Sequence, residues 1–156
     1  MRSGATGSSR REPLPGPLYF DASALVKLYV REPESDALNR EIRGRTDLLV
    51  SDLAVTEIVS SLCRRRREGS VDTPIVNRVQ RALLGHVEQG FYRRVELLPT
   101  THREAERLLL LLEGVPLRAA DALHLALAVS GDAASVFTYD GRLALAARSI
   151  GLAVFP

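Results

Sequence analysis

Four acidic residues of this chain lie beside apolar segments, where an unpaired carboxylate is costly. Asp21 follows the apolar stretch "LYF" and Asp140 follows "SVFTY", so each comes directly after an expected strand. Glu57 lies six residues after Ser51, about one and a half turns into an expected helix. Asp121 lies in "RAADALHLALA", among small and apolar neighbours. Two carboxylates about 4 Å apart repel by roughly 4 kcal/mol at an effective dielectric of 20, so such a group favours protonation or a bound cation.

The residue types favour a cation that is bound through oxygen. The chain has one cysteine, Cys63, and three histidines without metal-ligand spacing, which excludes a thiolate zinc cage. Carboxylates suit Mg2+ or Mn2+, which keep several bound waters for exchange with a substrate. A site of this kind activates a water for in-line displacement at a phosphodiester. The acids therefore predict metal-dependent phosphodiester hydrolysis.

Each acid also has a purely structural interpretation. Asp21 and Asp140 are consistent with N-caps of the helices that follow them, worth about 1 kcal/mol each. Glu57 is consistent with an ordinary exposed helix residue. Asp121 needs a partner in so apolar a helix, and Arg118, three residues earlier, is one candidate. The convergence of acids from four separate elements on one edge of a sheet favours a functional site over these interpretations.

Short apolar runs alternate with longer helical patterns from residue 18 onward, which indicates a mostly parallel sheet flanked by helices. Strands are expected at 18–20, 48–50, 91–98, 135–140 and 152–156. Helices are expected at 22–30, 35–43, 52–68, 73–87, 100–113, 116–131 and 141–151, with Ser35, Ser51 and Thr100 or Thr101 as N-caps. The fold class is therefore α/β, with about five strands and about seven helices.

The composition fits one globular domain. The 156 residues are 46% hydrophobic, enough to bury roughly two-thirds of the surface that the unfolded chain exposes. The net charge of +2 permits nucleic-acid binding without requiring it. No apolar run reaches the roughly 18 residues that span a bilayer, and no signal peptide is evident, so we expect a soluble, cytoplasmic protein. Residues 1–17, rich in Gly, Ser, Pro and Arg, are expected to form a disordered tail before a single domain at 18–156.

Four segments of the chain resemble PIN-domain ribonucleases, and among them the VapC-like toxins of type II toxin–antitoxin modules. They are "YFDASALVKLYV", "SDLAVTEIVSSL", "LRAADALHLALA" and "FTYDGRLALAARSIGL", in the family's order and spacing. The resemblance covers essentially 18–156 and implies a PIN-like three-layer α/β/α fold. It also implies a Mg2+-dependent endoribonuclease, with Mn2+ as a plausible substitute, that forms a homodimer and is inhibited by a VapB-like antitoxin.

The resemblance carries functional residues onto particular positions. The family's metal-binding and catalytic acids fall on Asp21, Glu57, Asp121 and Asp140. Supporting hydroxyls, which in the family help to order the metal site or its waters, fall on Ser23 and Thr138.

Three further residues are candidates for contacts with RNA or an antitoxin. Lys27 lies six residues after Asp21, and a phosphate or antitoxin contact competes there with a simple surface lysine. Arg118 and His124 flank Asp121 by about one helical turn, so either one positions the acid, faces substrate, or belongs to a small structural polar cluster. A general-base role for His124 is the weaker interpretation, because a metal-bound water needs no histidine.

The arginines of "CRRRREG" at 63–69 have two interpretations. They suit a solvated helix C-terminus, where they oppose the helix dipole, and they suit contacts with RNA phosphates. Four adjacent positions point all around a helix, so the sequence assigns them to no single face.

Three functions are compatible with these observations. The main hypothesis is a toxin that cleaves RNA with a bound metal. The second is a housekeeping PIN nuclease for RNA processing, and the third is a non-catalytic PIN module that binds RNA or a protein.

Overall fold

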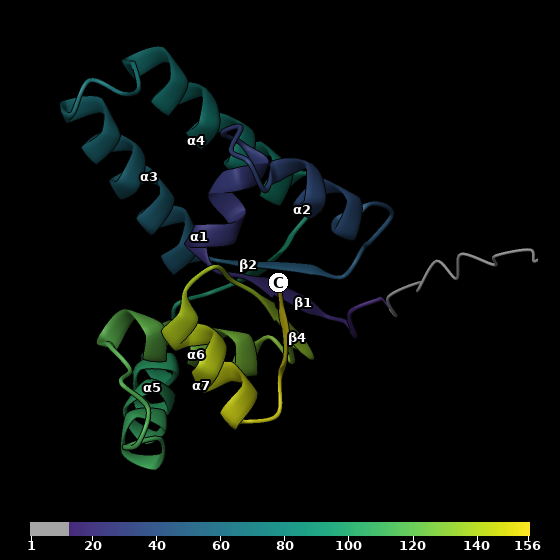
Figure 1. Ribbon diagram of the computed structural model, residues 1–156, viewed down its shortest axis with the longest axis vertical. Helices are drawn as coiled ribbons and strands as arrows, with labels where there is room; N and C mark the ends of the chain where they lie inside the picture. The colour runs from purple at the N-terminus through teal and green to yellow at the C-terminus, as the bar shows by residue number, and fades with distance from the viewer. Residues whose placement is uncertain (1–12) are drawn as a thin grey trace, which may run out of the picture.

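The computed structural model describes residues 13–156, which form a five-stranded parallel sheet between two layers of helices (Figure 1). The strands are β1 (Leu18–Phe20), β2 (Leu48–Ser51), β3 (Arg93–Val95), β4 (Ser135–Phe137) and β5 (Ala153–Phe155). Every neighbouring pair is parallel, in the order β3-β2-β1-β4-β5. The predicted α/β class and its five strands are confirmed. The chain leaves β1 first toward β2 and later returns to β4 on the other side, so the crevice beside the carboxyl end of β1 is a natural ligand site.

Two groups of helices cover opposite faces of the sheet (Figure 1). The first face carries α1 (Ala22–Leu25), the 3-10 turn η1 (Val26–Leu28), α2 (Ser35–Ile42), α3 (Asp52–Arg67) and α4 (Thr73–Glu88). The second face carries α5 (Pro99–Leu111), α6 (Ala119–Ser130) and α7 (Gly141–Ser149). Within residues 13–156, no helix is long and apolar enough to cross a membrane.

The strands β1, β2 and β4 are buried on both faces, which is why they read as largely apolar runs. Leu18 and Phe20 pack with the helices of the first face, whereas Tyr19, pointing the other way, packs with α5, α6 and α7. Gly131, just after α6, lies against the sheet. A Cβ there would lie 3.0 Å from Leu49 Cδ1 and 3.1 Å from Val95 Cγ2, so a larger residue would require these side chains to shift by a few tenths of an ångström.

Several boundaries differ from those expected because tertiary contacts decide them. The helix expected over 22–30 stops as an α-helix at Leu25 and continues as a 3-10 turn. Ser35 does not cap α2. Its hydroxyl donates to the carbonyl of Lys27 at 2.7 Å and accepts from the Glu32 N–H at 2.9 Å, so Glu34 holds the cap position. The strand expected over 91–98 pairs with β2 only at 93–95, because Leu98 already caps α5.

The segment before β1 makes contacts with the domain from Leu14 onward. Leu14 packs against the hydrophobic core between the sheet and the helices of its first face. Its carbonyl accepts a hydrogen bond from Arg45 Nη1 at 2.8 Å. The Pro17 carbonyl accepts the N–H groups of Ala134 and Ser135 at 2.9 and 3.2 Å. The remainder of the expected tail, residues 1–12, lies outside the described residues.

Candidate active site

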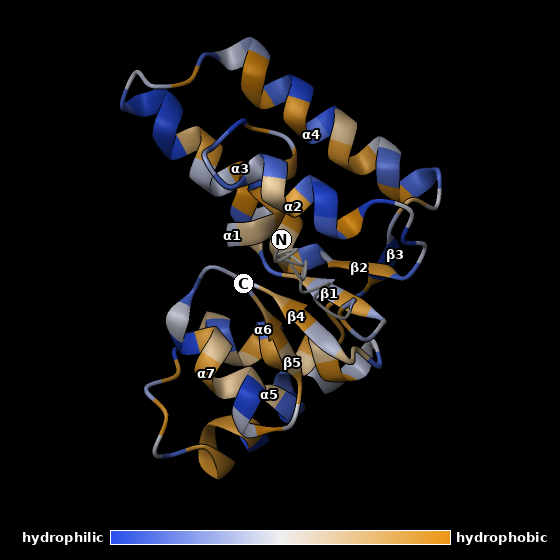
Figure 2. Cartoon of the chain, turned by 45° about the vertical axis from the view of Figure 1, so that its right-hand side comes forward, coloured by the Kyte–Doolittle hydropathy of each residue, from blue (hydrophilic) through white to orange (hydrophobic). Residues whose placement is uncertain are grey.

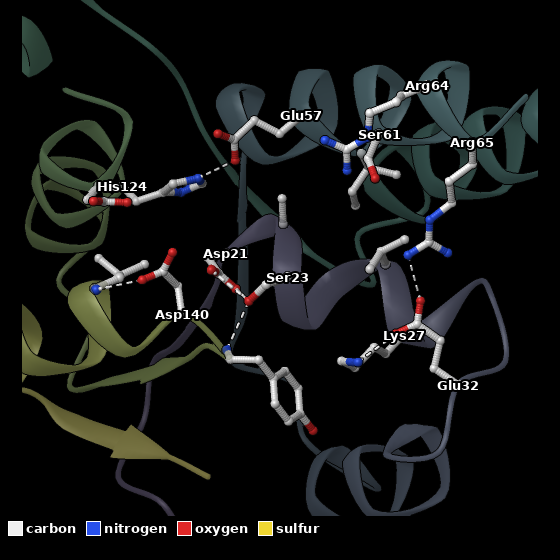
Figure 3. Close-up of a pocket in the computed structure, with 16 residues that line it drawn as sticks. Asp21, Ser23, Lys27, Glu32, Glu57, Ser61, Arg64, Arg65, His124 and Asp140 are labelled. Atoms are coloured by element: carbon white, nitrogen blue, oxygen red, sulfur yellow. Dashed lines mark hydrogen bonds and ion pairs between the residues drawn. The ribbon is translucent and has the colours of Figure 1, made fainter. Parts of the chain in front are cut away.

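A cleft of about 570 Å³ opens at the carboxyl edge of the sheet, and all four predicted acids line it. Asp21 and Asp140 follow β1 and β4, Glu57 comes from α3, and Asp121 from the first turn of α6. Figure 3 shows Asp21, Glu57 and Asp140 gathered toward one end of the cleft, with Lys27, Arg64 and Arg65 toward the other. The sequence therefore identified the acids that share this site, although they are as many as 119 positions apart (140 − 21).

Asp21 is the most enclosed of the four acids, with 5% of its surface exposed. It caps α1 through the Ala24 N–H at 3.0 Å. The hydroxyl of Ser23 contacts both carboxylate oxygens at 2.8 and 2.9 Å, and the Thr138 hydroxyl donates to Oδ2 at 2.8 Å. Burial raises the pKa of Asp21 above its usual value, although these hydrogen bonds oppose the shift. Both hydroxyl residues that the resemblance singled out thus lie on this carboxylate.

An arginine that the sequence analysis missed lies between two of the acids. Arg142 Nε donates to Asp121 Oδ2 at 3.2 Å, and its Nη2 donates to Asp140 Oδ2 at 3.3 Å. Asp140 also caps α7 by accepting the N–H groups of Arg142 and Leu143 at 2.8 and 3.3 Å. The expected partner of Asp121, Arg118, contributes only its backbone N–H at 3.0 Å, and its side chain is exposed.

Glu57 is held by a buried chain of hydrogen bonds that starts on the sheet. The hydroxyl of Tyr19 lies 2.8 Å from Ser51 Oγ and 2.7 Å from His124 Nδ1. His124 Nε2 lies 2.6 Å from Glu57 Oε2. A carboxylate only accepts, so Nε2 carries a proton; with a neutral ring, Nδ1 then accepts from Tyr19. Burial raises the pKa of Tyr19 far above its usual value, which keeps this hydroxyl protonated.

The structure changes the interpretation of His124. The residue lines the cleft but is only 4% exposed, and both ring nitrogens are engaged, so it positions Glu57 and leaves little surface for RNA or an antitoxin. It belongs to a polar cluster, as one interpretation of the sequence had it, but the partners are Tyr19 and Glu57 in place of Arg118.

Lys27 lies at the other end of the cleft and is neither a free surface lysine nor an unpaired cation. Its Nζ contacts Glu32 at 2.6 Å and Glu34 at 2.9 Å, and it lies 4.7 Å from the centre of the Tyr139 ring. Burial alone would lower the pKa of Lys27, but the hydrogen bonds to the two glutamates raise it above its usual value. The ammonium group therefore stays charged, and the glutamates neutralise it.

The end of the cleft lined by the four acids, here called the acid end, has the oxygen ligands that suit a hard divalent cation. In the structure, the guanidinium of Arg142 lies there. Four carboxylates face one cleft, and Arg142 supplies positive charge to two of them. In the part of the chain that the structure describes, no three His, Cys, Asp or Glu side chains form a group that could hold a metal ion as they lie. Arg142 and the N–H groups at helix N-termini engage oxygens of Asp21, Asp121 and Asp140. The metal site expected from the sequence stays a prediction.

Two of these residues carried no recognisable signal in the sequence. Tyr19 reads as one more apolar residue of a buried strand, and its partner His124 is 105 positions away. Arg142 is two residues after an expected acid, but only the packing of α6 beside α7 brings it to Asp121.

The chain is similar to known proteins. A family model for the PIN domain matches residues 18–149. Ribonuclease VapC46 of Mycobacterium tuberculosis (strain ATCC 25618 / H37Rv) is 37% identical in an alignment 142 residues long, which covers 88% of this chain and 95% of that protein.

Three solved structures share the fold. VapC20 of Mycobacterium tuberculosis, described as a sarcin-ricin loop cleaving toxin, has a TM-score of 0.65 and 16% identity, covering 83% of this chain and 95% of that one. PAE2754 of Pyrobaculum aerophilum has a TM-score of 0.63 and 23% identity, and the match covers 88% of this chain and 82% of that one. FitAcB of Neisseria gonorrhoeae has a TM-score of 0.64 and 17% identity, and the match covers 90% of this chain and 97% of that one.

Proposed function

The chain belongs to the PIN domain family, and from this premise we propose that it is a Mg2+- or Mn2+-dependent endoribonuclease, the toxin of a type II toxin–antitoxin pair. The observation that carries the proposal is the placement of Asp21, Glu57, Asp121 and Asp140 around one cleft at the carboxyl edge of the sheet. A relative named as a ribonuclease at 37% identity supports the same activity.

The residues of the site have complementary tasks in this mechanism. The four carboxylates would hold a divalent ion, which would supply an activated water and positive charge for the leaving oxygen. Ser23 and Thr138 fix the orientation of the Asp21 carboxylate. His124, aligned by Tyr19, fixes Glu57.

Arg142 balances the negative charge of Asp121 and Asp140 while no metal is bound. A cation at these carboxylates would repel the guanidinium, so Arg142 would lower the affinity of the site for a metal.

The proposed partners are RNA, a VapB-like antitoxin and a second copy of the chain, in the cytoplasm. The FitAcB and VapC structures that share the fold support an antitoxin partner. A self-association surface is suggested by the end of α5, where Leu109, Leu110 and Leu111 are 37%, 81% and 60% exposed. Figure 2 shows this end of α5 as an apolar tip of the molecule.

The proposed activity is tested by incubating the purified protein with a mixed pool of RNA in Mg2+, in Mn2+ and in EDTA, and by mapping the cleavage sites. The proposal predicts internal cleavage with either metal and none in EDTA. Cleavage that persists in EDTA would contradict the metal dependence. If the protein neither binds metal nor cleaves RNA, it is a non-catalytic member of the family.

A further inference from the structure

The acidic cleft continues along one face of α3. A second, adjoining cavity of about 270 Å³ is lined entirely from this helix, by Glu57, Ser60, Ser61, Arg64 and Arg67. These positions follow the spacing i, i+3, i+4, i+7 and i+10, so they form one stripe on the helix surface. Glu57, Ser61 and Arg64 line both cavities, which makes the two continuous. We call these five residues the α3 stripe.

The structure separates four arginines that the sequence could not assign to a face. Arg64 and Arg67 lie on the α3 stripe, and within residues 13–156 neither has an ion-pair partner. Arg65 points to the other wall of the acidic cleft, where it contacts Glu32 at 2.9 Å. Arg66 is exposed and lines neither cavity. Two unpaired guanidinium groups therefore lie on a path that begins at the acids.

We infer that the α3 stripe binds backbone phosphates of the RNA beyond the one that is cleaved. This inference rests on the proposed endoribonuclease function. At 1.5 Å rise per residue, the backbone of Arg64 is about 10 Å and that of Arg67 about 15 Å along the helix from Glu57. Arg64, which also lines the acidic cleft, and Arg67, one turn farther, therefore suit successive phosphates of a strand that leads away from the acids.

The chemistry of the α3 stripe favours a nucleic-acid backbone over a peptide. Guanidinium groups bind phosphate oxygens in a bidentate manner, and the hydroxyls of Ser60 and Ser61 supply further donors. The second cavity is lined only by polar and charged residues, so it offers no pocket for the apolar anchors that dominate peptide recognition. The α3 stripe would therefore raise affinity for RNA with little dependence on base sequence.

The test compares Arg64→Gln/Arg67→Gln with Arg66→Gln, a matched control on the same helix. A fluorescein-labelled single-stranded RNA of mixed sequence is titrated in EDTA at several KCl concentrations, and Kd is measured by anisotropy. The slope of log affinity against log salt should fall in magnitude by about 1.4 in the double variant, since each lost phosphate contact on a single strand removes about 0.7. Arg66→Gln should keep the wild-type slope.

A double variant whose Kd and slope match those of Arg66→Gln would overturn the inference. A double variant that keeps its RNA slope but loses binding to poly-L-glutamate would also overturn it, and would assign the α3 stripe to an acidic peptide. The proposed function is tested separately by the cleavage assay. It fails if the wild-type protein does not cleave RNA in Mg2+ or Mn2+, whatever the binding measurements show.

Discussion

At the scale of single residues, the guanidinium of Arg142 lies among the acids at which we propose that a metal ion binds. Arg142 contacts one oxygen each of Asp121 and Asp140, and its side chain remains one-third exposed, so it can move into solvent. The sequence predicted the acids because each follows or lies in a recognisable element. It could not predict Arg142 or Tyr19 as partners, because those contacts arise only when α6, α7 and β1 pack together.

Arg142→Gln should increase the affinity of the protein for Mn2+. Removal of the guanidinium leaves two carboxylates without their counter-charge, and an effect of roughly 1 kcal/mol corresponds to a Kd about fivefold lower. Isothermal titration calorimetry without RNA measures this directly. Arg148→Gln is the matched control, because Arg148 is exposed on the same helix and forms no ion pair within residues 13–156. An unchanged or weaker affinity for Mn2+ in Arg142→Gln would show that Arg142 does not compete with the metal.

At the scale of elements, the residues that begin the helices are also the residues of the site. Asp21, Ser51 and Asp140 each cap a helix at the carboxyl edge of the sheet, and Asp21 and Asp140 also line the cleft. The cap interpretation and the functional one thus apply to the same side chains. Local patterns sufficed to predict the strands and most helices. The 3-10 turn after α1 and the short β3 depend on contacts with distant segments, so no local pattern predicts them.

Asp52→Asn should weaken the attachment of α3 to the sheet edge in a pH-dependent way. The Asp52 carboxylate accepts from Arg94 Nε at 2.6 Å and from the Leu97 N–H at 3.3 Å. The hydrogen bond from Arg94 lowers the pKa of Asp52. A lowered pKa contributes stability that is present above the unfolded value and is lost as the pH falls through the folded value.

We therefore expect Asp52→Asn to reduce the free energy of unfolding by about 0.5–1 kcal/mol at neutral pH, a small effect because the pair is partly exposed. The difference from wild type should shrink as the pH falls below about 3.9, the value for an unfolded Asp, and should vanish once the folded carboxyl is also protonated. Urea unfolding over this pH range measures both values, with Asp36→Asn on the exposed surface of α2 as the control. A difference that stays constant with pH would refute the ionic origin of the effect.

At the scale of the whole molecule, the cleft lies between the two helical layers, and residues of both line it. The first layer also carries the α3 stripe, whereas the far end of α5 in the second layer exposes leucines away from the cleft (Figure 2). A cavity of about 500 Å³ beside these leucines is lined by residues of α5, α6 and α7, among them Leu111, Val129 and Ser149. An apolar patch of this kind is typical of an interface between protein chains.

Leu110→Lys should convert the proposed homodimer into a monomer. The side chain of Leu110 is 81% exposed, so a charge there costs the fold little but would be buried without a partner in a dimer. Light scattering coupled to size-exclusion chromatography gives the mass. Leu84→Lys, on α4 and 43% exposed, is the control. A Leu110→Lys protein that keeps the mass of a dimer would exclude this surface.

The central claim is that the four acids act together on RNA, and Asp21→Asn tests it most directly. Asn has the size of Asp without its charge, and the hydroxyls of Ser23 and Thr138 can rotate to accept hydrogen bonds from the new amide. Because burial raises the pKa of Asp21, the buried charge is itself costly, and the variant should fold with the wild-type circular dichroism spectrum. The decisive measurement is the rate of RNA cleavage in Mg2+ by folded Asp21→Asn protein beside wild type. We predict that cleavage is abolished, and cleavage at the wild-type rate would refute a joint role of the acids.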